Sequence, residues 1–219
     1  MNAEYYFKAQ VEFDQQYYVE RIDFQNWFRF YYLVKDVLRL KKKVVLEVGV
    51  GSGIVRSILL PHVQEYKVFD ISPNLSPDYV GNICENLPTL NQKFDCIIAA
   101  DVLEHLPFSE LPAAVANIKS YLMPGGRALV TIPHRQSNFL FMSPKLIPRV
   151  ITVTTGWLSI GAFYRRFIKR KIWIDPSHFW EIGDGNIKVK DVESVFLEAG
   201  FKIEKFSKLL YVDYWILEK

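Results

Sequence analysis

A short glycine-rich segment between a predicted strand and a predicted helix constrains the fold of this chain more than any other feature. The strand is the apolar run VVLEV at 44–48, and the helix is predicted in SGIVRSILLP at 52–61, where Pro61 closes it. At their junction stand Gly49, Gly51 and Gly53. Glycine in such a loop adopts positive φ angles and lets a ligand approach the backbone beside the start of a helix. The segment therefore predicts an α/β fold with a ligand site at this turn.

The spacing of these glycines distinguishes two classes of ligand. A dinucleotide site has the pattern GxGxxG, whose last glycine lets the helix pack closely on the strand. Here the pattern is GxGxG, and Ile54 stands at the third dinucleotide position. Glu47, two residues before Gly49, would repel a pyrophosphate but attract an amino group. We therefore expect a cationic or zwitterionic ligand.

Asp70 is the second candidate binding residue. It ends the predicted strand YKVFD at 66–70, and a carboxylate at this place can accept hydrogen bonds from both hydroxyls of a ribose. The alternative is that Asp70 merely begins the turn that follows. Because the glycine loop precedes it, we favour the ribose interpretation.

Strands and helices alternate along most of the remaining chain. Further strands are predicted near 79–80, 94–100, 127–133, 201–206 and 211–217, and helices near 109–122 and 189–200. This alternation predicts a mostly parallel sheet with helices on both faces. The last two strands, joined by a short link, predict an antiparallel pair at one edge.

The N-terminal part of the chain is aromatic and predicts one helix over about 14–39. Its apolar residues recur at helical spacing, which predicts a buried face made of Tyr17, Phe24, Phe28, Tyr31 and Leu38. We expect this helix to cover the sheet.

The ordered motifs resemble the class I S-adenosylmethionine-dependent methyltransferases, and in particular the small methyltransferase-domain proteins with an EHL segment after the fourth strand. The motifs are VLEVGVGSG, Asp70, GNICENLP, DCIIAADVLEHLP, LMPGGRALVTIP and LEAGF. The match covers about 44–133 and 189–219. It implies a Rossmann-like three-layer sandwich whose seven-stranded sheet has the order 3-2-1-4-5-7-6, with strand 7 antiparallel. The cofactor implied is S-adenosylmethionine, with S-adenosylhomocysteine as product.

The resemblance also implies a role for each matching residue in cofactor binding. Glu47 and the glycine loop would hold the amino acid end, Asp70 the ribose, and Asp101 with Val102 the methionine arm. Many relatives have aspartate where this chain has Asn82, whose amide oxygen can still accept a hydrogen bond. The full cofactor set is Glu47, Gly49, Gly51, Gly53, Asp70, Ile71, Asn82, Ile83, Asp101 and Val102.

The acceptor end is less well marked. His105 in the EHL segment and His178 in the segment DPSHFWE are the candidate catalytic residues, for acceptor contact or proton removal, with packing as the alternative for each. His134 and Glu104 are further candidates at the same rim. An (N/D)PP(Y/F) loop, frequent in methyltransferases that act on planar nitrogens, is absent after the fourth strand. Cys84 and Cys96 share no CxxC spacing, so a reduced protein without a metal site is expected.

Charge is concentrated in an insert after the fifth strand. Residues 135–174 contain eight basic residues and no acidic one, so the rest of this +3 chain carries −5. Within it, 157–171 predicts a basic amphipathic helix that can lie at a membrane surface, cover an acceptor or form an ordinary solvated face. We expect one domain over 1–219, with a helical cap at 1–42 and an insert at 135–180 that contacts the acceptor or a membrane.

Three functions remain open at this stage. The first is methyl transfer to a small-molecule, glycan-linked or lipid-linked acceptor. The second is RNA methylation through the basic insert, which the acidic remainder of the chain makes less favourable. The third is a cofactor-binding module without catalysis. The start of the chain lacks the pattern of a secretory signal, so a cytoplasmic protein is expected, with a peripheral membrane position if 157–171 lies at an interface.

Overall fold

A seven-stranded sheet forms the centre of the protein. The computed structural model describes residues 13–134, 137–142, 144, 148–153, 164, 168, 175, 177–183 and 187–219. The strands of the sheet are β1 (Val44–Val48), β2 (Glu65–Asp70), β3 (Tyr79–Val80), β4 (Phe94–Ala100), β5 (Leu122–Pro133), β8 (Lys202–Lys208) and β9 (Val212–Glu218).

The sheet order is β3-β2-β1-β4-β5-β9-β8, with β9 antiparallel to both of its neighbours. This is the predicted order 3-2-1-4-5-7-6 once the two strands inserted after β5 are left out of the numbering, so the predicted fold class is confirmed. The strand predicted at 79–80 is present as the two-residue β3.

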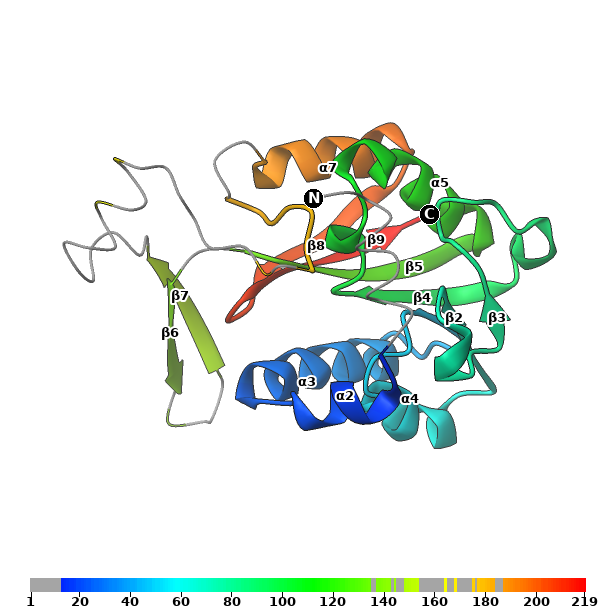
Figure 1. Cartoon of the computed structure of the whole chain (residues 1–219), viewed down its shortest axis with the longest axis horizontal. Helices are drawn as coiled ribbons and strands as arrows, with labels where there is room; N and C mark the ends of the chain where they lie inside the picture. Colours follow the sequence, from blue (N-terminus) through cyan, green and yellow to red (C-terminus); the bar gives the residue numbers. More distant parts are fainter. Residues whose placement is uncertain are drawn as a thin grey trace.

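Helices cover both faces of the sheet (Figure 1). One face carries α5 (Leu111–Tyr121) and α7 (Val189–Glu198), and the other carries α2 (Gln15–Glu20), α3 (Phe24–Arg39) and α4 (Ile54–Leu59). Short 3-10 turns occupy several connections: η1 (Leu60–His62), η2 (Pro73–Leu75), η3 (Pro88–Leu90), η4 (Leu103–His105) and η5 (Phe108–Glu110). None of the helices within the described ranges is long and apolar enough to cross a bilayer.

The central strands are buried on both faces, which explains their continuous apolar sequences. In β4, Ile97 and Ala99 belong to the core under α5 and α7, whereas Cys96 and Ile98 belong to the core under α3 and α4. All four side chains are fully buried. Successive residues of a strand point to opposite faces, so a sheet covered on both sides needs apolar residues at every position.

The predicted N-terminal helix is two helices, and of the five residues predicted for its buried face only Phe28 is buried. Asp14 and Asp23 each cap a new helix, accepting hydrogen bonds from the backbone amides of Tyr17 and Asn26. The side chains that α3 buries in the core include Phe30, Leu33 and Val37, whereas Phe24, Tyr31 and Leu38 are exposed. So many apolar residues occupy this segment that more than one stripe has helical spacing, and the packing against β1 and β9 selects between them.

The insert after β5 begins as a hairpin, not as a helix. Strands β6 (Ser137–Met142) and β7 (Pro148–Val153) pair antiparallel with each other and form a separate two-stranded sheet. The hairpin projects to one side of the body in Figure 1. The predicted amphipathic helix over 157–171 lies outside the described residues, apart from the exposed Tyr164 and Ile168.

Candidate functional site

The glycine loop makes a compact turn between β1 and α4. Gly49, Gly51 and Gly53 have φ angles of +87°, +49° and +70°, a backbone conformation that residues with a Cβ rarely adopt. At Gly49 a Cβ would lie 2.7 Å from Cγ2 of Val102, so glycine is needed for this loop to meet the end of β4. At Gly53 a Cβ would collide with the Gln15 side chain, which donates to the carbonyl of Ser52 and brings α2 over the loop.

Asp70 is bound directly to the glycine loop. Its Oδ2 accepts from the backbone amide of Val50 at 2.7 Å, and its Oδ1 accepts from the amide of Ser72 at 2.8 Å. Each carboxylate oxygen has two acceptor positions, so both oxygens can still accept from a diol. Burial raises the pKa of Asp70. Tyr18 of α2 lies close enough to Asp70 to be affected by its charge. Burial, together with this charge, raises the pKa of the Tyr18 phenol to about 12.

Glu47 is a buried carboxyl group at the end of β1. It accepts a hydrogen bond from the Tyr66 hydroxyl at 2.9 Å. Burial raises the pKa of Glu47 to about 8, although Tyr66, Arg29 and Arg56 act in the opposite direction. A cation bound beside this group would favour its ionised form, as the sequence interpretation requires.

The segment after β3 lies beside Asp70, because the amide of Gly81 donates to the Asp70 carbonyl. Ile71 is half-buried and Ile83 is buried. The side-chain oxygen of Asn82 accepts from the amide of Cys84 at 3.0 Å. One of the two acceptor positions of this oxygen is therefore already used within the turn.

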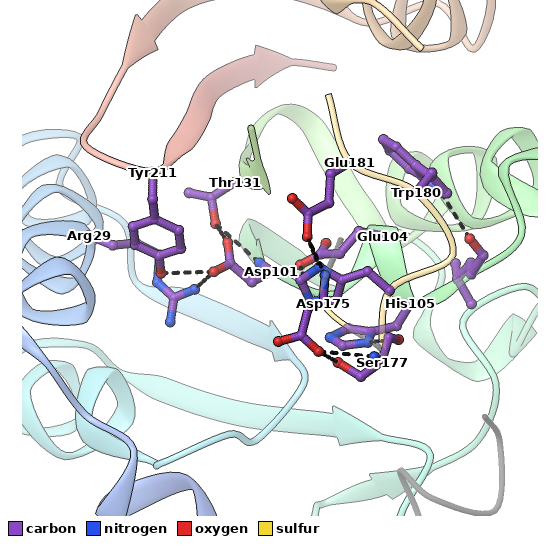
Figure 2. A network of polar contacts seen from close by, with 12 residues as sticks. Arg29, Asp101, Glu104, His105, Thr131, Asp175, Ser177, Trp180, Glu181 and Tyr211 are labelled. Atoms are coloured by element: carbon purple, nitrogen blue, oxygen red, sulfur yellow. Dashed lines mark hydrogen bonds and ion pairs between the residues drawn. The ribbon is translucent and has the colours of Figure 1, made fainter. Parts of the chain in front are cut away.

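Asp101 joins four elements at the end of β4 (Figure 2). Its Oδ1 accepts from the Thr131 hydroxyl of β5 at 2.6 Å. Its Oδ2 forms an ion pair with Arg29 of α3 and accepts from the Tyr211 hydroxyl, before β9, at 2.9 Å. Asp101 also has a φ of +54°, which is strained for a residue with a Cβ. Such a residue persists because the surrounding contacts fix it.

A pocket of about 350 Å³ opens beside Asp101. It lies where the carboxyl ends of β4 and β5 meet the start of α3, the place where ligands bind in open α/β sheets. Of the candidate histidines, His178 and His134 line this pocket, whereas His105 is absent from its wall. The lining residues are Asp23, Gln25, Asn26, Asp101, Pro133, His134, Asp175, His178, Glu181 and Tyr211.

The segment 177–183 is held against the sheet by backbone and aromatic contacts. Trp180 is buried and its indole donates to the carbonyl of Leu106 at 2.9 Å. The amide of Phe179 donates to the carbonyl of Glu104, and that of Ile182 to the carbonyl of Pro133. These contacts place His178 over the turn η4.

His105 and His178 meet at this point, as Figure 2 shows for His105 and its partners. Their rings lie 4.7 Å apart between centroids at an angle of 82°. The Nδ1–H of His105 donates to the carbonyl of Ser177 at 2.9 Å, and the Nδ1–H of His178 donates to Glu181 at 2.7 Å. In the neutral form of each ring, Nδ1 therefore carries the proton and Nε2 has the free lone pair. Burial and the neighbouring His178 lower the pKa of His105 to about 4.

Glu104 lies beneath the two histidines and is fully buried. Its Oε1 lies 3.9 Å from Nε2 of His178. Neither carboxyl oxygen has a hydrogen-bond partner in the described part of the chain. Burial raises the pKa of Glu104 to about 8, Glu181 and Asp175 raise it further, and Arg29 lowers it.

Sequence reasoning missed Arg29, Thr131, Tyr211 and Glu181. Arg29 stood in a segment assigned to packing, and nothing local pointed from it to Asp101. Tyr211 lies before the last strand and reaches the site only because β9 is adjacent to β5. Glu181 carried a usable signal, since it follows His178 by three residues in the motif HFWE.

Comparisons with known proteins agree with this architecture. A family model described as "Methyltransferase domain" matches residues 25–205. The N-methyltransferase NodS of Bradyrhizobium japonicum WM9, solved with S-adenosyl-L-homocysteine, superposes with a TM-score of 0.63 at 14% identity and covers 100% of this chain and 99% of its own. That likeness concerns the fold.

Curated relatives match over shorter stretches. The ubiquinone biosynthesis O-methyltransferase of Coxiella burnetii is 26% identical over 115 residues, 47% of this chain and 48% of that protein. The ribosomal RNA small subunit methyltransferase A of Thermobifida fusca is 34% identical over 77 residues, 34% of this chain and 26% of that protein. The chain thus spans less than half the length of these two relatives. The family model, by contrast, covers most of the sequence, and the chain belongs to the methyltransferase domain family.

Proposed function

We propose that this chain transfers a methyl group from S-adenosylmethionine to an acceptor bound in the pocket beside Asp101. The observation that carries the proposal is the hydrogen bond from the amide of Val50 to Asp70, because it makes the glycine loop and the ribose-binding acid one unit. The fold shared with NodS, whose structure holds S-adenosyl-L-homocysteine, supports the same cofactor.

The residues of the loop fit this cofactor. Apart from Gly51 and its two chain neighbours, no described residue has an atom within 4 Å of where a Cβ of Gly51 would stand, so the loop leaves room for a ligand there. Glu47 would face the ammonium of the amino acid end. Asp70 would accept from the two ribose hydroxyls.

Two further groups of residues complete the proposed cofactor site. Ile71, Asn82 and Ile83 would border the adenine. Val102, packed on Gly49, and Asp101 would border the methionine arm.

The cofactor supplies an activated methyl group, so the protein mainly has to orient the acceptor and exclude water. His178 lines the pocket, and its Nε2 can receive a hydrogen bond or a proton from an acceptor oxygen or nitrogen. Glu181 orients the ring through Nδ1, and His105 packs against the ring from behind. We therefore assign acceptor contact to His178 and its support to His105 and Glu181.

The acceptor we favour is a small molecule, free or linked to a glycan or a lipid. Four carboxylate side chains line the pocket: Asp23, Asp101, Asp175 and Glu181. They disfavour a phosphate backbone at this place. RNA methylation remains the second candidate, because of the basic composition of 135–174 and the likeness to a ribosomal RNA methyltransferase. It predicts RNA binding that weakens steeply as salt increases.

The first experiment is calorimetric titration of the whole chain with S-adenosylmethionine. We expect wild type to bind, and Asp70→Ala to lose about 1.5–3 kcal/mol, the scale of hydrogen bonds to a charged group. Glu198→Gln, an exposed change on α7, is the control and should bind as wild type does. Circular dichroism of each variant checks the fold. Equal affinity of Asp70→Ala and wild type would remove Asp70 from the site.

Catalysis is tested separately from binding. Radiolabelled methyl transfer to a panel of phenols, amines and glycosides should give a labelled product that disappears with His178→Ala. Tight cofactor binding with no product across the panel would favour the non-catalytic module.

A further inference from the structure

Three side chains converge beside the pocket, and one of them, His178, lines it. One ligand atom from each of Glu104, His105 and His178 lies within 4.8 Å of the other two. The Nδ1–H groups of both histidines are used elsewhere, on Ser177 and Glu181. Nε2 of His178 faces Oε1 of Glu104 at 3.9 Å, and a ring nitrogen of His105 lies within 4.8 Å of the ligand atoms of both.

Ligand atoms gathered around a buried carboxyl group favour a bound cation, because an unpaired buried carboxylate is costly. Arg29, which acts electrostatically on Glu104, is already paired with Asp101. The charge around the cluster is negative, as Asp175 and Glu181 lie beside it. Glu104 is 0% exposed, and neither of its oxygens has a hydrogen-bond partner among the described residues.

We infer that Glu104, His105 and His178 form a binding site for a divalent transition-metal ion of the Zn²⁺ type. Two imidazoles and one carboxylate are a ligand set that suits such ions and leaves a fourth position for a water or substrate. A tetrahedral ion with bonds of about 2.0 Å holds its ligand atoms about 3.3 Å apart, so the three side chains would close by on the order of 1 Å.

The surroundings of the cluster also match a metal site. Histidine ligands commonly donate their other ring N–H to a carboxylate or a backbone carbonyl, which fixes the ring and its tautomer. His178 does so to Glu181, and His105 does so to the carbonyl of Ser177. The sequence did not indicate this site, because Glu104–His105 and His178 come from segments far apart in the chain.

The open position of the ion would face the acceptor. Of the three ligands His178 lines the pocket, whereas Glu104 and His105 do not. An acceptor hydroxyl bound to the ion would lose its proton more readily, as a metal-bound water does. With the ion present, Nε2 of His178 is a ligand, and the ion replaces the imidazole as the group that activates the acceptor.

The test is metal binding by the purified full chain, freed of any affinity tag and treated with chelator. Titration with ZnCl₂ by calorimetry, and elemental analysis after dialysis, should give one equivalent per chain. Titration with CoCl₂ should give the visible absorption of a tetrahedral site. MgCl₂, whose ion prefers oxygen ligands, should not compete. His62→Ala, an exposed histidine, is the matched control and should bind as wild type does.

The variants separate ligands from supporting residues. Glu181→Gln should weaken Zn²⁺ binding about 10–100-fold, as loss of an outer partner does, and Glu104→Gln and His178→Ala should weaken it more than that. Glu104→Gln keeps the shape of the side chain, and a thermal melt checks its fold. No bound equivalent in folded wild type would overturn the site, and so would equal Zn²⁺ affinity of wild type and Glu104→Gln. The assay contains no S-adenosylmethionine, so its failure leaves the proposed methyl transfer standing.

Discussion

The buried carboxyl of Glu47 should make the stability of the ligand-free protein depend on pH. Burial raises its pKa from 4.5 to about 8 in the folded chain. The folded state therefore holds the proton more tightly than the unfolded state does. The resulting stabilisation is fully present below the unfolded pKa and is lost as pH rises through the folded pKa. Between pH 5 and pH 8 this amounts to a loss of about 3 kcal/mol in the free energy of unfolding.

Glu47→Gln removes the titration and keeps an oxygen that can accept from the Tyr66 hydroxyl. Urea unfolding at pH 5 and pH 8 measures the effect, because all other titrating groups are common to both proteins. We expect the loss of stability between the two pH values to be smaller in the variant by about 3 kcal/mol. Glu198→Gln should leave this difference unchanged. The same loss in wild type and Glu47→Gln would refute the reasoning.

The same group should couple cofactor binding to proton release. At pH 7 most of the ligand-free protein carries a protonated Glu47, because its pKa is about 8. An ammonium bound beside it favours the carboxylate, so binding of S-adenosylmethionine should release up to one proton. Calorimetry in two buffers of different ionisation enthalpy measures this release. Glu47→Gln should abolish the difference between the buffers; a difference that persists would place the ammonium elsewhere.

Two further pairs of variants test the packing of α3 and the glycine loop. Val37→Ala should reduce the free energy of unfolding by about 2 kcal/mol, because the Val37 side chain is 0% exposed. Leu38→Ala should reduce it by less than about 0.5 kcal/mol, because Leu38 is 42% exposed. Urea titration compares the two variants, and equal losses of stability would contradict the observed buried face of α3. Gly49→Ala combines a positive φ with a contact on Val102, so it should destabilise by about 1–3 kcal/mol and weaken cofactor binding. Gly125→Ala has a positive φ in open space and should cost less, which separates the clash from the backbone strain.

The sheet, and the arrangement of the residues proposed to bind the cofactor, could be predicted because their signals are local. A strand buried on both faces needs apolar residues at each position, which is why 94–100 was recognised. Gly49 and Asp70 each end a strand, and parallel strands bring their carboxyl ends to one edge. The bond from Val50 to Asp70 then follows from the pairing of β1 with β2.

The acceptor end was only partly predictable, because its contacts join distant segments. His105 and His178 were selected separately, and their perpendicular contact depends on how Trp180 anchors its segment to Leu106. The hairpin β6–β7 was missed because its strands lie in a stretch interrupted by prolines and charges. The buried face of α3 was predicted correctly only at Phe28, because several of its faces are apolar and only tertiary contacts decide between them.

Asp101 explains why the two ends of the site cannot be treated as independent. It lines the pocket proposed for the acceptor, and the next residue, Val102, packs on Gly49 of the glycine loop. Its strained backbone is held by Thr131 from one side and by Arg29 from the other. Because Arg29 belongs to α3, the N-terminal cover fixes the position at which the two halves of the site meet. A change in α3 that releases Arg29 would therefore alter the acceptor pocket and the glycine loop together.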